Sequence, residues 1–271
     1  MRVRIVFSDA DGTLLNEKKR ITPKTRAAIH DLAEIGISFV IASSRGPTGI
    51  YPIQEELGLP GPIICFSGGL ILDEKRTVLW EQGFSKETAG RVLEAVEDWN
   101  REMRSSLSLA WCLYSFEDWF VKSRKDPRIL HEERMVKARS REGDLSSVSG
   151  DRIHKIMCSG GPEGILGVER KLKEAFPHLS IVKSSPYLLE ICAEGIHKGL
   201  ALEKVCGIYG ISAGDALAFG DNYNDREMLL AAGKAVLMAN APEDLRHEFP
   251  YHTLDNEHDG IAHALKELGL V

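Results

Sequence analysis

The sequence predicts an α/β fold, in which a core with a parallel sheet is interrupted by an inserted α+β domain. Strand-like and helix-like segments alternate over residues 3–66 and again over 199–268, which is typical of a parallel sheet with right-handed crossovers. Between these stretches, strand-like segments follow one another closely, as in a separate α+β unit. We therefore expect a core formed by residues 1–81 and 189–271 and an inserted cap formed by residues 82–188.

The first half of the core begins with a short β-rich run at residues 3–7. Thr22 followed by Pro23 is a helix start signal, because the hydroxyl caps the first turn and proline fits there. Gly36 suits the left-handed position that ends such a helix. The apolar run 37–42 is typical of a strand buried on both faces. A weaker helix at 50–57 and a strand at 63–66 complete this half.

The remaining elements are less regular in the insert than in the second half of the core. After a hairpin formed by 70–72 and 77–80, we expect a helix at 85–101, strands at 108–114, 119–122 and 153–158, a helix after Pro162, and strands near Ile181 and Leu188. The second half of the core then has a helix at 199–209, a strand at 216–219, a helix at 225–232, a strand at 235–238 and a helix at 260–268.

The bulk properties exclude several classes of partner. The net charge is −6 and the basic stretch 122–141 is diluted by acidic residues, so a nucleic-acid partner is not expected. No apolar run approaches the roughly 18 residues that a membrane-spanning helix needs, so no membrane partner is expected either. Five widely spaced cysteines without a C-x-x-C pair indicate reduced, buried thiols, and we expect a cytoplasmic protein.

Polar side chains follow the predicted strands at the points where those strands end. In open α/β sheets, ligands bind beyond the carboxyl ends of the strands, so these side chains should lie at one edge of the sheet. They are Asp9 and Asp11 after the first strand, Ser43, Ser44 and Arg45 after the second, and Asp221, Asn224 and Asp225 after the strand 216–219, with Lys198 at the start of a helix.

This set of residue types indicates phosphoryl transfer. Several carboxylates gathered together repel one another unless a cation neutralises them or one holds a proton. Oxygen ligands suit Mg²⁺, whereas zinc would favour His or Cys. Lys198, Arg45 and Ser43 are good phosphate partners. Two aspartates at i and i+2 can divide the work, since one can attack phosphorus while the other moves the proton of the leaving group.

Competing motifs fail on their own spacing. An EF-hand loop that started at Asp9 would need Gly at its sixth position and Glu at its twelfth, where the chain has Leu14 and Arg20. No G-x-x-x-x-G-K-[ST] or G-x-G-x-x-G run is present.

Four segments in order resemble the signatures of the haloacid dehalogenase superfamily. They are Asp-Ala-Asp-Gly-Thr at 9–13, Ala-Ser-Ser-Arg at 42–45, His-Lys-Gly at 197–199 and Gly-Asp-Asn-Tyr-Asn-Asp at 220–225. The resemblance runs from Val3 to the C-terminus and is greatest to the Cof-like sugar-phosphate phosphatases, which have an inserted α+β cap. It implies a Rossmann-like core, and a cap that closes over that core to exclude water. Two departures, Ser43-Ser44 for the usual Thr-Gly and Ser67-Gly68-Gly69 for Asn-Gly-Ala, weaken analogies about specificity.

The resemblance also implies roles for single residues. Asp9 would attack the phosphoryl group and become an aspartyl phosphate, and Asp11 would act as general acid and then as general base. Ser43 and Lys198 would hold the transferring oxygens. Mg²⁺ would be bound by the Asp9 carboxylate, the Asp11 carbonyl and Asp221, with Asp225 supporting the site from just outside. Substrate contacts are expected from Ser44, Arg45, Gly68 and Asn224.

The resulting hypothesis is a Mg²⁺-dependent phosphatase of small phosphorylated metabolites, sugar phosphates in particular, acting as a monomer or homodimer. One alternative is a phosphomutase, which would return the phosphoryl group to another hydroxyl. The other is a non-catalytic metabolite-binding protein, against which the retention of Asp9, Asp11, Lys198 and Asp221 argues.

Overall fold

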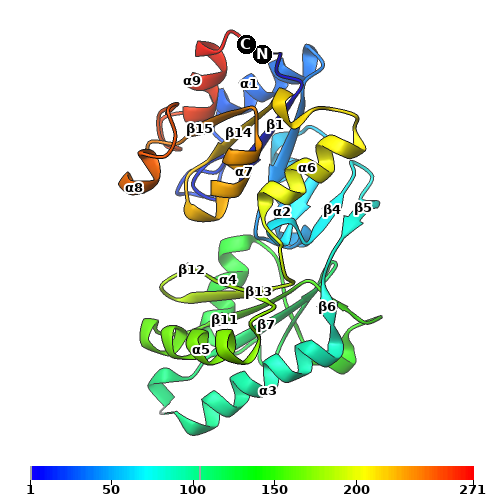
Figure 1. Cartoon of the computed structure of the whole chain (residues 1–271), viewed down its shortest axis with the longest axis vertical. Helices are drawn as coiled ribbons and strands as arrows, with labels where there is room; N and C mark the ends of the chain where they lie inside the picture. Colours follow the sequence, from blue (N-terminus) through cyan, green and yellow to red (C-terminus); the bar gives the residue numbers. More distant parts are fainter. Residues whose placement is uncertain (1, 104) are drawn as a thin grey trace. The chain divides into compact units, whose positions relative to one another are not determined.

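The computed structural model describes residues 2–103 and 105–271, which form two compact units (Figure 1). Of the described residues, 2–81 and 197–271 form the core unit, and 82–103 and 105–196 form the inserted unit. The chain therefore returns to the core later than residue 189, where the sequence analysis placed the return. The reason is that β13 (Leu188–Cys192) pairs with β11 (Lys155–Ser159) and β12 (Ser180–Ser185) of the inserted unit.

The core unit is built on a sheet whose described residues form seven strands in the order β15-β14-β1-β2-β3-β4-β5. The first five in this order are parallel. Strand β4 pairs antiparallel with β3, and β5 pairs antiparallel with β4. The central strand β1 lies between β14 and β2, so the sheet is wound outwards in both directions from β1. The bounds are β1 Ile5–Asp9, β2 Ser38–Ala42, β3 Ile63–Cys65, β4 Leu70–Leu72, β5 Val78–Glu81, β14 Ala216–Gly220 and β15 Lys234–Leu237.

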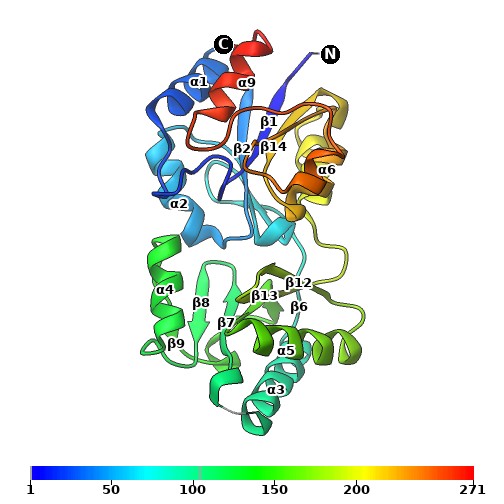
Figure 2. The ribbon, with the colours of Figure 1, turned by 90° about the vertical axis from the view of Figure 1, so that its left-hand side faces the viewer.

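Helices cover both faces of this sheet (Figure 2). Helices α1 (Pro23–Glu34), α2 (Pro47–Leu57) and α9 (Gly260–Glu267) lie on one face. Helices α6 (Lys198–Ile208) and α7 (Arg226–Ala231) lie on the other, and the short α8 (Glu243–Arg246) follows β15. The Thr22 side chain accepts from the Thr25 amide at 3.3 Å, which is the cap predicted for α1.

The packing of α6 fixes where its first residue lies. Leu202 and Val205 of α6 are fully buried against Phe7 of β1 and Val40 of β2. Burying such apolar side chains stabilises by roughly 25 cal/mol per Å². Because this face of α6 packs on the sheet, Lys198 at the start of α6 lies next to the carboxyl end of β1.

The inserted unit contains a six-stranded sheet over its described residues, in the order β12-β13-β11-β7-β8-β9. All of its pairs are antiparallel except β8 with β9. Helices α3 (Lys86–Glu102) and α5 (Pro162–Ala175) run along one face (Figure 1). The other bounds are β6 Phe84–Ser85, β7 Ala110–Ser115, β8 Asp118–Val121, α4 Pro127–Val136, β9 Arg141–Glu142 and β10 Arg152–Ile153.

The thiols agree with the sequence-based expectation. All five cysteines are buried and none forms a disulfide, and burial raises the pKa of Cys112, Cys158 and Cys192 to about 12. Within residues 2–103 and 105–271, none of the helices is long and apolar enough to span a membrane.

Candidate active site

Three carboxylates meet at the carboxyl ends of neighbouring strands of the core. Asp9 is the last residue of β1, and Asp221 directly follows β14, which pairs with β1. Asp225 lies one short 3-10 turn further on. Carboxylate oxygens of all three residues lie within 4.8 Å of one another, as expected for side chains at the same edge of a parallel sheet.

Lys198 joins two of these carboxylates. Its ammonium lies 2.5 Å from Asp9 Oδ1 and 2.6 Å from Asp225 Oδ1, and its side chain is fully buried. A buried ammonium is stable only with such partners, because an unpaired charge away from water is costly. The structure thus brings together residues 189 positions apart, from the first and third of the four signatures.

Asp225 is occupied by hydrogen bonds on both oxygens. Besides the contact of its Oδ1 with Lys198, its Oδ2 accepts from the backbone amides of Asp221 and Asn222 at 3.0 and 3.1 Å. A carboxylate used in this way fixes the Asp221 loop and orients the lysine. The place of Asp225 just outside a metal site stays a prediction, since its carboxylate lies in the same acidic group as those of Asp9 and Asp221.

Asp221 is oriented by two residues to which the sequence analysis gave no role. Thr13 donates to Asp221 Oδ1 at 2.7 Å, and Asn240 Nδ2 lies 3.4 Å from Asp221 Oδ2 and 2.8 Å from the Gly12 carbonyl. Thr13 belongs to the first signature and Asn240 lies outside all four, and no spacing rule says which oxygen either residue contacts.

The protein groups at this site do not balance the negative charge of the three carboxylates. Burial raises the pKa of Asp9 well above its ordinary value, and the negative charge of Asp225 adds to this. Burial and Asp225 likewise raise the pKa of Asp221 to about 6. Burial lowers the pKa of Lys198, but the charges of Asp225 and Asp9 outweigh this effect and raise it overall. Three carboxylates and one ammonium leave an excess negative charge that a cation would neutralise.

The donors fit a divalent cation with a preference for oxygen. The carboxylates of Asp9, Asp221 and Asp225 could hold it, and carboxylate oxygens are ligands that Mg²⁺ takes in proteins. Gly12 gives the room, since a Cβ at this position would lie 2.3 Å from Asp221 Oδ2.

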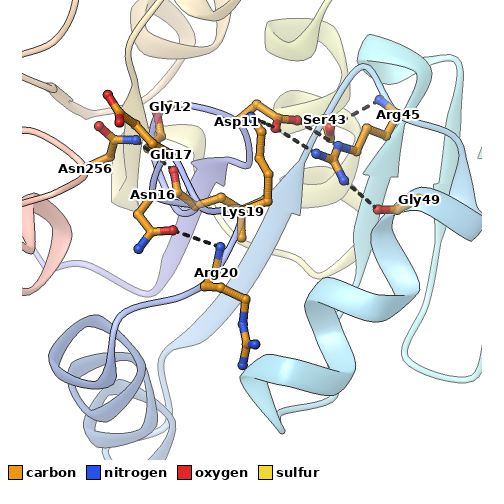
Figure 3. Close-up of polar contacts among 12 residues, drawn as sticks. Asp11, Gly12, Asn16, Glu17, Lys19, Arg20, Ser43, Arg45, Gly49 and Asn256 are labelled. Carbon is orange, nitrogen blue, oxygen red and sulfur yellow. Dashed lines mark hydrogen bonds and ion pairs between the residues drawn. The ribbon is translucent and has the colours of Figure 1, made fainter. Parts of the chain in front are cut away.

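The Asp11 carboxylate has a different environment (Figure 3). Arg45 contacts it through two nitrogens, with Nε 2.7 Å from Oδ2 and Nη2 2.7 Å from Oδ1, and Lys19 Nζ lies 2.7 Å from Oδ1. Burial raises the pKa of Asp11, but the hydrogen bonds and charges of Arg45 and Lys19 outweigh it and lower the pKa overall. The sequence analysis did not predict Lys19 as a site residue. Its contact with Asp11 depends on the conformation of the loop that carries it, which no motif indicates.

The remaining predicted residues lie in several environments. Ser43 follows β2 and is buried, and its hydroxyl oxygen accepts from the Arg45 amide at 3.2 Å. Ser44 is half-buried and Asn224 is exposed. Gly68 has φ +115°, and a Cβ there would lie 2.8 Å from the His197 carbonyl, so this glycine permits a close approach to the start of α6.

A family model described as haloacid dehalogenase-like hydrolase matches residues 6–265. The chain belongs to this family. It is 32% identical over 267 residues to a Haemophilus influenzae protein named provisionally as a phosphatase, covering 98% of each chain. It is 28% identical to the HMP-PP phosphatase of Yersinia pseudotuberculosis, covering 97% of this chain and 94% of that one.

A solved haloacid dehalogenase-like hydrolase from Bacteroides thetaiotaomicron superposes with a TM-score of 0.89 at 28% identity. The alignment covers 98% of this chain and 100% of that one. The expected fold, a Rossmann-like core with a parallel sheet plus an inserted α+β unit, is confirmed, as is the resemblance to the Cof-like members. The chain is a phosphatase of the haloacid dehalogenase-like family.

Proposed function

We propose that this phosphatase hydrolyses small phosphate monoesters, sugar phosphates in particular, through an aspartyl phosphate on Asp9 and with Mg²⁺ as its metal. The single observation that carries the proposal is Lys198, which is fully buried between Asp9 and Asp225 beside Asp221. This arrangement joins a nucleophile, a fixed cation and a metal-binding carboxylate at one sheet edge. Phosphoryl transfer depends mainly on such positioning and charge neutralisation.

In the first step, an Asp9 carboxylate oxygen attacks phosphorus in line. The ester P–O bond breaks, an aspartyl phosphate forms, and Asp11, which enters this step protonated, gives its proton to the departing alkoxide. Lys198 keeps Asp9 oriented through Oδ1 and neutralises charge on the transferring oxygens. Ser43, which follows the neighbouring strand β2, would bind one of those oxygens.

In the second step, Asp11 takes a proton from water as that water attacks phosphorus. The bond between phosphorus and the Asp9 oxygen breaks, which releases inorganic phosphate and restores both carboxyl groups. Arg45 and Lys19 beside Asp11 stabilise the carboxylate that the first step leaves, and this carboxylate is the general base of the second step. When bound by Asp9, Asp221 and the Asp11 carbonyl, Mg²⁺ would supply charge neutralisation of the phosphoryl oxygens.

The partner that we propose is a small phosphorylated metabolite, and neither nucleic acid nor a membrane is needed. A net charge of −6 gives no broad attraction for a polyanion, so a phosphate must be drawn by local cations. Lys198 and the Mg²⁺ proposed at the acidic cluster would provide that local charge.

The test is a phosphate-release screen over a panel of sugar phosphates and other small phosphate esters, with and without EDTA. We expect turnover of at least one ester, loss of activity in EDTA, and recovery with added Mg²⁺. Formation of a phosphorylated isomer without phosphate release would contradict hydrolysis and support a mutase. Release of phosphate by the Asp9→Asn variant would contradict the covalent route.

A further inference from the structure

We propose that Lys19 is a positioning residue for Asp11, and that it holds the carboxylate of the proposed general acid and base in place together with Arg45. The inference rests on the proposed function, because it assigns a task to Asp11 in that reaction. It adds a residue that lies in the loop between β1 and α1, outside all four signatures.

Three short contacts fix the Asp11 carboxylate (Figure 3). The guanidinium of Arg45 contacts both carboxylate oxygens, which sets the plane of the group. Lys19 Nζ adds a third contact to Oδ1 at 2.7 Å. With cations at both oxygens, rotation of the carboxylate about its Cβ–Cγ bond would break at least one charged contact. Proton transfer depends on such a fixed position, because the acid must lie within hydrogen-bond reach of the leaving oxygen.

Arg45 is itself anchored. Its side chain is 8% exposed, and Nη1 donates to the Gly49 carbonyl in the first turn of α2 at 3.2 Å. Arg45 also lies close to the end of β2, whose last residue is Ala42. Arg45 is therefore held in place, and the third contact to the Asp11 carboxylate depends on the loop that carries Lys19.

The loop around Lys19 is built to hold that side chain towards Asp11. Lys19 has φ +55°, a left-handed conformation that a residue with a side chain adopts only where its surroundings require it. The Lys19 amide donates to the Asn16 carbonyl at 2.9 Å, and the Asn16 amide donates to the Arg20 carbonyl at 3.0 Å. The Asn16 side chain also accepts from the Arg20 amide at 3.0 Å.

The C-terminal part of the core also holds this loop. Asn256 Nδ2 donates to the Leu15 carbonyl at 2.8 Å, and the Glu17 amide donates to Glu257 Oε1 at 2.6 Å. These contacts come from a segment about 240 residues away in the chain. A loop held from both sides can place an ammonium accurately, which a freely moving surface lysine cannot do.

The ordinary alternative is a surface ion pair without a catalytic task. Lys18 shows what such a residue looks like, because it is exposed on the same loop. Lys19 differs, since its side chain is only 24% exposed and contacts a carboxylate already held by Arg45. The two neighbouring lysines give a matched pair of variants.

The test compares two substrates that differ in how much they need a proton donor. p-Nitrophenyl phosphate has a leaving group that departs without protonation, whereas glucose 6-phosphate releases an alkoxide that requires it. Asp11→Asn should lose turnover of glucose 6-phosphate most. Because Asp11 also acts as base when the shared aspartyl phosphate is hydrolysed, the readout is kcat/KM, which reports only the steps up to departure of the alcohol. Lys19→Ala should lower kcat/KM for glucose 6-phosphate about 10-fold, a part of the roughly 100-fold or more that a positioned acid contributes. For p-nitrophenyl phosphate, kcat/KM should change less than about 2-fold by the same reasoning.

Two controls keep the result interpretable. Lys18→Ala should behave as the wild type on both substrates, and Lys19→Arg should recover most of the lost kcat/KM because it retains a cation. An equal loss of kcat/KM on both substrates in Lys19→Ala, or no loss on either, would overturn the inference. No phosphate release by the wild type from either ester would instead overturn the proposed function on which the inference rests.

Discussion

At the scale of single residues, Lys198 is the group on which the stability of the acidic cluster depends. We expect Lys198→Met to lose about 3–5 kcal/mol of unfolding free energy, because removal of one partner leaves the Asp9 and Asp225 carboxylates buried without it. Urea unfolding at pH 8, with Lys18→Met as an exposed control, measures this. Equal stability of the two variants would contradict the assigned role.

Replacement of Asp9 should not lower stability as replacement of Lys198 does, but it should have a large effect on catalysis. Asp9→Asn removes one of three crowded carboxylates whose burial already raises its pKa, so we expect unchanged or higher thermal stability. Activity should fall about 10³-fold or more, since the nucleophile is gone. Thermal unfolding and phosphate release on the same sample check both parts, and a less stable variant would show that the cluster is not under repulsion.

The sequence predicted the positions of these residues better than the directions of their side chains. Asp9, Asp221 and Lys198 could be placed together because parallel strands end at the same sheet edge. The sequence predicts a substrate contact for Arg45, but it did not show that the guanidinium contacts Asp11. The direction of a long side chain depends on tertiary neighbours such as Gly49, which no spacing rule provides.

At the scale of elements, the loop after β1 has a conformation that depends on glycine. Gly12 has φ +87°, and its added Cβ would lie 2.3 Å from Asp221 Oδ2. Gly36 has φ +78° with nothing within 4 Å of an added Cβ. Gly36→Ala should therefore cost only the backbone strain, about 1–2 kcal/mol. Gly12→Ala should add to this a displaced Asp221 carboxylate.

The comparison of the two glycine variants isolates the effect of the clash. We expect Gly12→Ala to need at least about 10-fold more Mg²⁺ for half-maximal activity, in the range seen when groups that orient metal ligands are lost. Gly36→Ala should have the wild-type requirement. A titration of activity with Mg²⁺ measures both, and equal requirements would contradict the placement of the metal beside Asp221.

Most elements could be predicted because their apolar periodicity or capping residues are strong, as at Thr22 for α1 and Ser85 for α3. Helix α4 was missed although Asp126 and Pro127 form a start signal, and Asp126 does accept from the Arg128 amide. Only Ile129 of α4 is buried, so the helix has almost no apolar face to recognise. Helix α8, at four residues, is too short to show any periodicity.

At the scale of the whole molecule, the stability of the inserted unit should depend on pH through His154. Burial, with the charge of Arg152, lowers the pKa of this histidine from 6.5 to about 4. The unfolded chain therefore binds more protons than the folded one between these values, and stability is lost as the pH falls from 6.5 to 4. The loss is at most about 3 kcal/mol.

A variant that cannot titrate separates this effect from the general acid sensitivity of the protein. His154 Nδ1 accepts from the Phe116 amide at 3.1 Å, and an asparagine oxygen can accept in its place without titrating. We expect His154→Asn to lose less unfolding free energy than the wild type between pH 7 and pH 5. Identical losses, measured by urea unfolding at the two pH values, would contradict a neutral buried histidine.

The alternation of strands and helices also predicted the two-part organisation of the chain. The return to the core was placed too early because β13 is apolar, like the core strands, and pattern alone cannot tell which sheet it joins. Only its pairing with β11 and β12 assigns it to the inserted unit.

The central claim of the account is that Asp9 carries the phosphoryl group. The most direct test is to mix the protein with p-nitrophenyl phosphate and Mg²⁺, quench with acid during the first turnovers, and map phosphorylation of peptides by mass spectrometry. We predict one added phosphoryl group on Asp9 in the wild type and none in Asp9→Asn. Phosphate release without any phosphorylated Asp9, or with the label on another residue, would contradict the account.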